Sequence, residues 1–455
     1  MSGERMSALD ASFLAVETPS AHMHVGWVAE FCPSAEDRLP TFAQLRRHIE
    51  RRVGRAPRYR QKLAAVPLGV HTPEWIDDEA FAIDRHVYWA PGPLHDLVDQ
   101  VMSMPLRRDR PLWEIWICQN PQARTFAVVG KAHHCMVDGI AAVELGSMLL
   151  DATREPSACE SGHWTPAAPP SAERLLVRGV RDLIGDQLGL LRWPVRAASS
   201  PVGAARGTAA GLLRATRALS HSLRGAPASV LNGPLSPLRR LAWTERPLAD
   251  LRAVKRAHGT SVNDVVLAAV AGGIRTYLLR RGEPPVALKA LVPVNVRSGK
   301  AEDLGNRVSF VFAELPCDEP DALERLGHVH ATMSARKRNR EPEGADLAIK
   351  AAEHTPGVVQ HAISRVLASP RTFNLVVSNI PGPSEPMYLL GCPLQATYPI
   401  VPLADRHAVS VGMTTVGERA CFGVYADREA LPDAGALAAD IDDALTELLV
   451  LTPRG

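Results

Sequence analysis

The sequence predicts an α/β protein of two domains, and three observations lead to that prediction. Strand-like and helix-like segments occur in both halves of the chain in a similar order, and a stretch rich in Pro, Ser and Ala separates them. The 455 residues are enough for two domains that each bury a core. Hydrophobic residues make up 46% and charged residues 22%, the mix of a folded globular protein. We expect a domain over 1–155, a linker with a basic segment over 156–233, and a second domain over 234–455.

The composition of the chain argues against several classes of protein. A net charge of +2 gives no reason to expect a nucleic-acid partner. The seven cysteines are scattered without a CxxC pair, which suggests neither a disulfide framework nor a zinc ribbon. The N-terminal stretch has acidic residues and no apolar core of a signal peptide, and no uncharged apolar run approaches the ~20 residues that cross a bilayer. We therefore expect a cytoplasmic protein.

Local patterns predict the elements of the first half. Residues 41–54 place Phe42, Leu45, Ile49 and Val53 on one helical face, and a second helix is expected at about 94–104. Strands are expected at 112–118 and 125–132, joined by a turn, and a helix after residue 139.

In the second half, one helix ends at Gly259 and a longer one begins at the capping residue Ser261. The remaining expected elements are strands at 286–297 and 306–316, a helical region at 321–368, a strand-to-turn at 373–383, a hairpin at 407–427 and a helix at 436–452.

The stretch HHCMVDG (133–139) carries the chemistry. It lies between a predicted strand and a predicted helix, where Gly139 permits a tight turn. A neutral imidazole can remove a proton from an alcohol near pH 7. Because adjacent residues of an extended chain point to opposite sides, one of His133 and His134 faces the substrate, and the spacing does not say which. Asp138 could orient a histidine or pair with an arginine.

Other interpretations of this region are weaker. A histidine pair alone is more often surface or core than catalytic. Adjacent histidines chelate one metal ion poorly and no third ligand is near, so we expect no metal site. Cys135 is a possible nucleophile, but an alcohol acceptor needs no covalent intermediate. AVSVG (408–412) is close to the GxSxG motif of hydrolases but lies in an alternating strand pattern.

Together with five further motifs, HHCMVDG resembles a known family. It looks like the HHxxxDG motif of the coenzyme A-dependent acyltransferase superfamily, which includes chloramphenicol acetyltransferase and the condensation domains of nonribosomal peptide synthesis. Within it, the chain resembles the bacterial wax ester synthase/diacylglycerol acyltransferases from about residue 7 to about 430. The motifs that carry the resemblance are LDASFLAVET near the N-terminus, Pro111-Leu112-Trp113, Asn263-Asp264, LGNRVS (304–309) and SNIPGP (378–383).

The resemblance implies two chloramphenicol acetyltransferase-like domains with mixed sheets and an active-site tunnel between them. It implies that His134 is the base beside His133. It also implies that Asp138 holds the loop by binding an arginine, and Arg297 is our candidate for that arginine. Asn263 then steadies an oxyanion or orients substrate, with Asp264 beside it. The resemblance further implies that the acyl tunnel is shaped by Pro111, Leu112, Trp113, Ser378, Asn379, Pro381 and Gly382.

Each of these motifs also has a purely structural interpretation. Trp113 alternates with Ile115 and is equally consistent with core packing. Asn263 and Asp264 stand where helix-capping residues are favoured. SNIPGP has the composition of a turn.

The resemblance implies transfer of a long acyl group from acyl-CoA to diacylglycerol or, as a second choice, to a fatty alcohol. Acyl-CoA is then a substrate, and no cofactor is implied. Two alternatives stay open: an acyltransferase that takes its acyl group from a carrier protein, and a non-catalytic lipid-binding or lipid-droplet protein.

Residues 187–225 contain six arginines and no acidic residue, with apolar residues between them. We expect residues 172–225 to bind a membrane or lipid-droplet surface, which would make the protein peripheral at the inner membrane or a droplet. The alternative is an interdomain connection whose arginines keep it soluble.

Overall fold

The computed structural model describes most of the chain. The described residues are 3–33, 38–120, 122–136, 148–157, 164–198, 225–295, 308–339 and 357–453. Asp138, Gly139, Arg297, the helix expected after residue 139 and residues 199–224 of the basic segment lie outside them.

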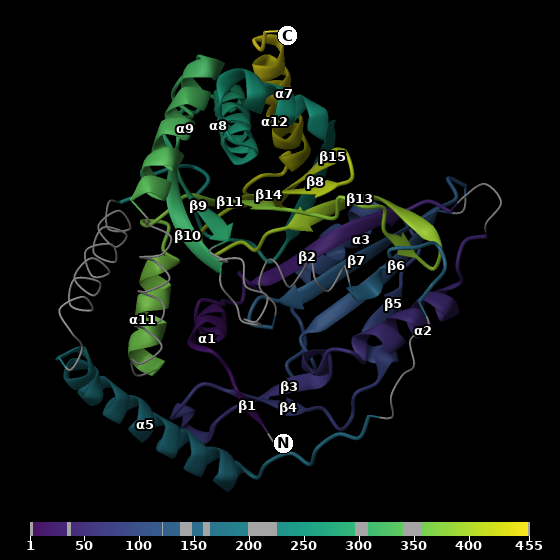
Figure 1. Ribbon diagram of the computed structural model, residues 1–455, viewed down its shortest axis with the longest axis vertical. Coiled ribbons are helices and arrows are strands. Elements are labelled where there is room, and N and C mark those ends of the chain that lie inside the picture. The colour runs from purple at the N-terminus through teal and green to yellow at the C-terminus, as the bar shows by residue number, and fades with distance from the viewer. Residues whose placement is uncertain are drawn as a thin grey trace.

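The first half is built on a six-stranded mixed sheet with the order β12-β13-β2-β7-β6-β5 (Figure 1). Its strands are β2 (His24–Phe31), β5 (Val87–Trp89), β6 (Trp113–Asn120), β7 (Thr125–His133), β12 (Tyr388–Leu389) and β13 (Cys392–Ile400). All neighbours are antiparallel except β5 and β6. A small sheet lies beside it, made of β1 (Glu4–Arg5), β3 (Gln61–Ala64) and β4 (Glu74–Asp77).

The second half has its own six-stranded mixed sheet, in the order β10-β9-β11-β14-β15-β8. Its strands are β8 (Arg239–Pro247), β9 (Leu288–Asn295), β10 (Val308–Leu315), β11 (Leu375–Ile380), β14 (Val409–Val416) and β15 (Arg419–Asp427). Strand β11 is parallel to β9 and β14, and the other pairs are antiparallel. The expected two-domain fold with mixed sheets is confirmed.

The α-helices of the described residues lie on the two large sheets and around them. They are α1 (Ala8–Ala15), α2 (Phe42–Val53), α3 (Leu94–Ser103), α5 (Ala172–Ala198), α7 (Leu248–His258), α8 (Val262–Arg280), α9 (Ala322–Arg338), α11 (Gly357–Leu367) and α12 (Ala434–Val450). Thr41 and Ser261 form capping boxes that begin α2 and α8, and Gly259 ends α7 with a φ of 65°. The helices expected around residues 41–54, 94–104 and 248–259 are therefore confirmed.

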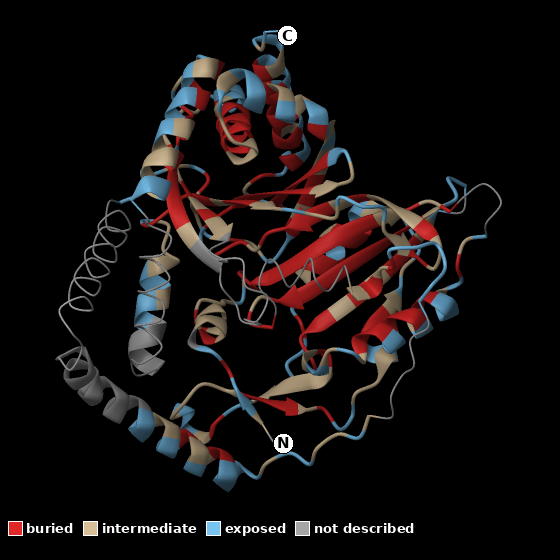
Figure 2. Cartoon of the chain, in the orientation of Figure 1, coloured by how far each residue is buried: buried red, intermediate tan, exposed pale blue. Residues whose placement is uncertain are grey.

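Helix α8 is the core of the second half. Within the described residues it is the one helix long and apolar enough to cross a membrane, but 72% of the apolar stretch is buried inside the molecule. It packs among α7, α9 and α12, and it is buried on nearly every side (Figure 2). A side chain at Gly273 would meet Ile441 of α12 at 2.5 Å, so glycine allows the two helices to pack closely.

Strand β13 joins the two halves, which the sequence patterns did not predict. It comes from the second half of the chain but pairs with β2 of the first, with Thr397 opposite Ala29. Its end also lies against the second sheet, where Gly412 of β14 and Gly423 of β15 are paired with each other. A Cβ at Gly423 would lie 2.2 Å from the carbonyl oxygen of Pro399, so glycine is needed for β13 to pass there.

Candidate active site

Strand β7 ends at His133, and the chain turns over the next three residues. The Met136 N–H donates to the His133 carbonyl at 2.9 Å, which closes a turn with His134 at its corner. The His133 N–H donates to the Leu112 carbonyl, and the His134 N–H donates to the Met23 carbonyl, both at 2.9 Å. The backbone of both histidines is therefore held from two sides.

The His133 ring is buried, with 1% of the residue exposed. The Cys135 N–H donates to its Nδ1 at 3.1 Å, so the ring proton resides on Nε2. Burial lowers the pKa of His133, although the nearby Glu17 carboxylate opposes this. With Nδ1 occupied and Nε2 protonated, this ring has no free lone pair with which to accept a proton from a substrate.

Glu17 faces His133 from the segment that follows α1. Its Oε2 lies 3.7 Å from the His133 Nε2, longer than a hydrogen bond, and it forms an ion pair with Arg108. Burial alone would raise the pKa of Glu17, but His133 and Arg108 outweigh burial and the pKa is lowered. Glu17 is therefore a carboxylate at neutral pH.

His134 has a different environment. It is only partly buried, and its ring stacks on Phe13 of α1 with a centroid distance of 3.7 Å and an angle of 15° between the planes. The two histidines thus point into different surroundings, as expected at a strand end. The assignment of His134 as the base remains a prediction.

Cys135 follows the histidines but is buried, and burial strongly raises the pKa of its thiol. A thiol that keeps its proton is a poor nucleophile, which agrees with setting Cys135 aside.

Pro111, Leu112 and Trp113 lie next to the histidines through the bond between Leu112 and His133. All three are buried, and the Trp113 indole N–H donates to the Tyr59 carbonyl at 2.8 Å. The Trp113 ring also stacks on His86 at 4.5 Å, inside the core of the first half. Trp113 is therefore a core residue, and a role for this motif in shaping a tunnel remains a prediction.

Asn263 and Asp264 lie in the first turn of α8. The buried Asp264 carboxylate accepts from the Ser261 N–H and contacts the His330 Nδ1, both at 2.9 Å. The capping interpretation of Asp264 is confirmed. Asn263 is partly buried beside it, and its role in orienting substrate remains a prediction.

The SNIPGP motif is the end of a strand followed by a bend. Ser378 and Asn379 belong to β11, whereas Pro381 and Gly382 follow it. A Cβ at Gly382 would lie 1.9 Å from the Thr415 carbonyl oxygen, so only glycine fits against β14. This packing accounts for the glycine, and a role in the tunnel remains a prediction.

Residues to which the sequence assigned no role complete the surroundings of the histidines. Phe13 and Glu17 belong to LDASFLAVET, which contributed to the family resemblance without an assigned role, and Met23 follows it. Their contacts with residues 133 and 134 join segments more than 100 positions apart, which local periodicity does not reveal. Among the described residues, no group of three His, Cys, Asp or Glu side chains could hold a metal ion.

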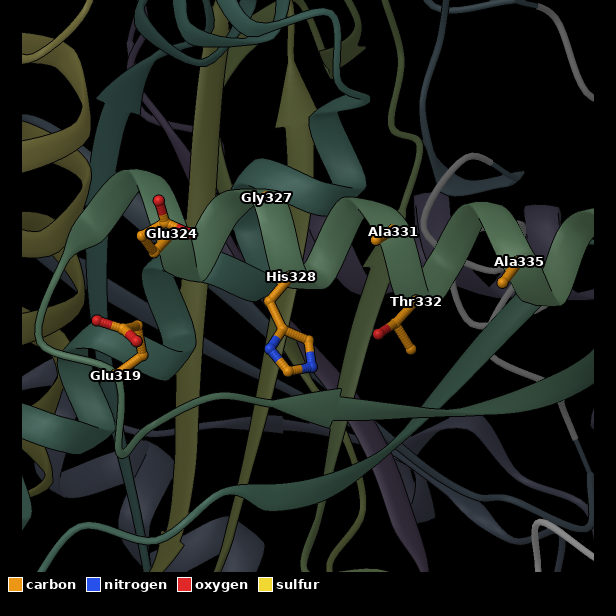
Figure 3. Close-up of a pocket in the computed structure, with 7 residues that line it drawn as sticks. All are labelled: Glu319, Glu324, Gly327, His328, Ala331, Thr332 and Ala335. Atoms are coloured by element: carbon orange, nitrogen blue, oxygen red, sulfur yellow. The ribbon is translucent and has the colours of Figure 1, made fainter.

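Away from these histidines, the described part of the chain has two surface hollows. One, of about 570 Å³, runs along α9 and is lined by Glu319, Glu324, Gly327, His328, Ala331, Thr332 and Ala335 (Figure 3). The other lies on α5 and is lined by Leu176, Val177, Val180, Arg181 and Ile184. Among the described residues, no hydrogen bond or ion pair joins the lining of either hollow to His133 or His134.

Comparison with solved structures defines the class of fold. The starter condensation domain of rhizomide synthetase, solved with C8-CoA, matches 99% of this chain and 94% of its own with a TM-score of 0.59 at 14% identity, a likeness of fold alone. The wax ester synthase/diacylglycerol acyltransferase of Marinobacter aquaeolei VT8 matches 98% of this chain and 99% of its own, with a TM-score of 0.68 and 27% identity. The chain has the fold of the acyltransferases that its histidine motif resembles.

Sequence comparison gives the family. Residues 6–266 match the wax ester synthase/diacylglycerol acyltransferase catalytic domain, and residues 304–449 match the C-terminal domain of the same family. The protein named probable diacylglycerol O-acyltransferase tgs1 of Mycobacterium tuberculosis is 32% identical over 99% of this chain and 96% of its own length. The chain belongs to the wax ester synthase/diacylglycerol acyltransferase family, and the expectation of an O-acyltransferase is confirmed.

Proposed function

We propose that this chain transfers a long acyl group from acyl-CoA to the hydroxyl of diacylglycerol, or of a long-chain alcohol, with His134 as general base. Its relatives are named for both acceptors, and diacylglycerol is the acceptor in the name of the mycobacterial relative. The donor and acceptor are the substrates, and no cofactor takes part.

The observation that carries the proposal is the different state of the two histidines. The Cys135 N–H occupies the Nδ1 of the buried His133 ring, and the Glu17 carboxylate faces its Nε2 at 3.7 Å. His134 instead stands at the corner of a turn and is partly exposed. A general base must reach the proton that it removes, and the partial exposure of the second ring supports its assignment as the base.

The reaction follows from this placement. His134 takes the proton of the acceptor hydroxyl, and the oxygen attacks the thioester carbonyl carbon. The resulting tetrahedral oxyanion collapses, the carbon–sulfur bond breaks, and the coenzyme A thiolate recovers the proton from the imidazolium. Because the proton returns within the same cycle, the reaction needs neither a metal nor a redox group.

The test is an assay by thin-layer chromatography with labelled palmitoyl-CoA as donor and either diolein or hexadecanol as acceptor. His134→Ala is expected to fold normally and to lose at least ~10²-fold in turnover, the usual contribution of general-base catalysis. His133→Ala is expected to lose less activity but some stability, because its ring is buried. Near-normal turnover of folded His134→Ala would refute the proposed base.

The same assay distinguishes acyl-CoA from an acyl-carrier protein as the acyl donor. An acyltransferase of secondary metabolism would accept an acyl-carrier protein as sole donor and fail with acyl-CoA. A non-catalytic lipid-binding protein would show no turnover with either donor, while still binding lipid droplets.

The proposal extends to where the enzyme acts. Diacylglycerol and fatty alcohols dissolve in a lipid phase, so a cytoplasmic enzyme must visit that surface. Helix α5 presents Val177, Val180 and Ile184 to solvent, 62%, 41% and 54% exposed, on the face opposite Leu175 and Gly179, which pack on the body. The acid-free run of arginines follows in the sequence. We infer that this face rests on an anionic membrane or droplet, which makes the protein peripheral.

A further inference from the structure

Helix α1 brings an aromatic ring onto the proposed base. The Phe13 ring lies 3.7 Å from the His134 ring, centroid to centroid, and the two planes are only 15° apart. Most aromatic pairs in proteins are wider, with centroids about 4.5–7 Å apart. The contact is therefore a close face-to-face stack.

The position of Phe13 is fixed from several sides. Ser7 caps α1 by accepting from the Asp10 N–H, and α1 packs against α11 of the second half (Figure 1). The Arg365 Nε of α11 donates to the Ala15 carbonyl at 3.4 Å. Phe13 itself packs on the core of the first half. A ring held in this way restricts the plane of the imidazole beneath it.

The stacking of Phe13 on His134 also has an electrostatic consequence. The face of a phenylalanine ring carries negative potential, which attracts a cation and has much less effect on a neutral ring. The base is neutral before the reaction and becomes an imidazolium when it takes the acceptor proton. An interaction that strengthens as charge develops lowers the barrier, whereas one of constant strength does not.

Other charged and titratable groups surround the turn that contains His134. The carboxylates are Asp10 and Glu17 and the cations are Arg58 and Arg108, all of which act on the adjacent Cys135. On β2, β7 and the loop before β2, burial lowers the pKa of His22, His24 and His133, and the neighbouring Lys131 is held by Glu114. A change confined to the Phe13 ring leaves all of these in place.

We propose that Phe13 is a positioning residue for the reaction, which holds the plane of His134 and stabilises its imidazolium form. The proposal rests on His134 being the base. Because the Phe13 face favours the protonated ring, weakening that face should destabilise the imidazolium relative to the neutral ring.

The experiment replaces Phe13 in the full chain by phenylalanines with one, two and three ring fluorines. Fluorination keeps the shape of the ring and progressively removes the negative potential of its face. Steady-state kinetics with palmitoyl-CoA and diolein are measured between pH 5.5 and 9. We expect kcat to fall stepwise, by roughly tenfold over the series, because cation–π stabilisation of this size lies between that of exposed and that of desolvated pairs. The KM for palmitoyl-CoA should stay within about twofold, and the acidic limb of kcat should move to lower pH by up to about one unit.

The matched control is the same series at Phe126, which stacks on Phe31 at 5.0 Å in the core of the first half. Both series are compared by thermal melting, so that a loss of folding is recognised. An unchanged kcat and an unmoved acidic limb across the folded Phe13 series would overturn the proposal, even with His134→Ala inactive. An active His134→Ala would instead overturn the proposed function.

Discussion

His24 lies opposite His133 in the sheet and is buried, and neither of its ring nitrogens has a hydrogen-bond partner among the described residues. Burial lowers the pKa of His24 well below its usual value, and Lys131, His133 and His22 lower it further. The ring is therefore neutral in the folded protein, and unfolding allows it to take up a proton in mild acid.

This protonation makes the stability of the folded protein fall as the pH falls. A histidine whose pKa is lower in the folded state stabilises the protein fully above the unfolded value, ~6.5, and this contribution is lost as the pH falls. Below that value His24 is expected to remove up to about 1.4 kcal/mol of unfolding free energy per pH unit. His24→Phe should flatten the fall of the melting temperature between pH 7 and 5. His328→Phe, on the exposed side of α9, is the control and should keep the wild-type slope; equal slopes for all three proteins would contradict the prediction.

At the scale of single residues, the histidine motif was recognisable because it is a short local pattern with a specific spacing. Its division into one buried and one partly exposed ring was not, since that depends on Glu17, Met23 and Leu112 from other segments. Trp113 illustrates the same limit: its alternation with Ile115 suited both a core and a tunnel until its contacts with Tyr59 and His86 decided for the core.

At the scale of elements, the passage of β13 over β14 and β15 depends on their paired glycines. Gly423→Ala would place a methyl group 2.2 Å from the Pro399 carbonyl oxygen, a backbone atom with little room to move. Overpacking of this kind costs about 1–3 kcal/mol. We expect a lower melting temperature for Gly423→Ala, and no loss for Gly435→Ala in α12, where the added methyl meets nothing within 4 Å. Equal melting temperatures of the two variants would show that β13 can move aside.

Helix α5 gives a second prediction at this scale. Replacing Val177, Val180 and Ile184 by serine removes an exposed apolar stripe without touching the body of the protein. In co-sedimentation with anionic liposomes, binding should weaken by at least about tenfold, because each valine or isoleucine contributes on the order of 1 kcal/mol when half of it is buried. Activity on an acceptor dispersed in detergent should survive.

The control for this stripe is Val450→Ser with Leu451→Ser at the end of α12, where the two residues are 77% and 45% exposed. This pair should leave liposome binding unchanged. Binding should also weaken with salt and with arginine-to-glutamate changes at positions 192, 196, 214 and 217, which lie in the acid-free run of the sequence. Equal sedimentation of wild type and both groups of variants would refute the surface assignment.

Elements with strong local signals were predictable, and those defined by distant partners were not. A few neighbouring residues specify the caps and the periodicity of α2, α7 and α8. Strand β2 is buried at almost every position, so it lacks the alternation that marks a half-buried strand. The pairing of β13 with β2 joins segments more than 360 residues apart, and no local rule specifies it.

At the scale of the whole molecule, β13 makes the two halves depend on one another. If the chain is divided within 158–163, the first fragment lacks β12 and β13 and exposes the edge of β2. Unpaired strand edges promote aggregation, so this fragment should be insoluble alone and soluble when produced together with the second. Thr397→Pro in the second fragment should abolish the rescue, because proline is poorly accommodated inside the stretch of β13 that pairs with β2, whereas Thr397→Val should preserve it. A soluble first fragment on its own would contradict this expectation.

The position of β13 in the sequence imposes a delay between the synthesis of β2 and that of β13. The first half, apart from β12 and β13, ends at about residue 157, but β13, the second partner of β2, begins only at Cys392, after about 235 further residues. At ~5–20 residues per second the ribosome needs roughly 12–47 s to produce it. Throughout that interval the nascent chain carries an open β2 edge in a crowded cell. Chaperone demand during translation is thus a consequence of where β13 stands in the sequence.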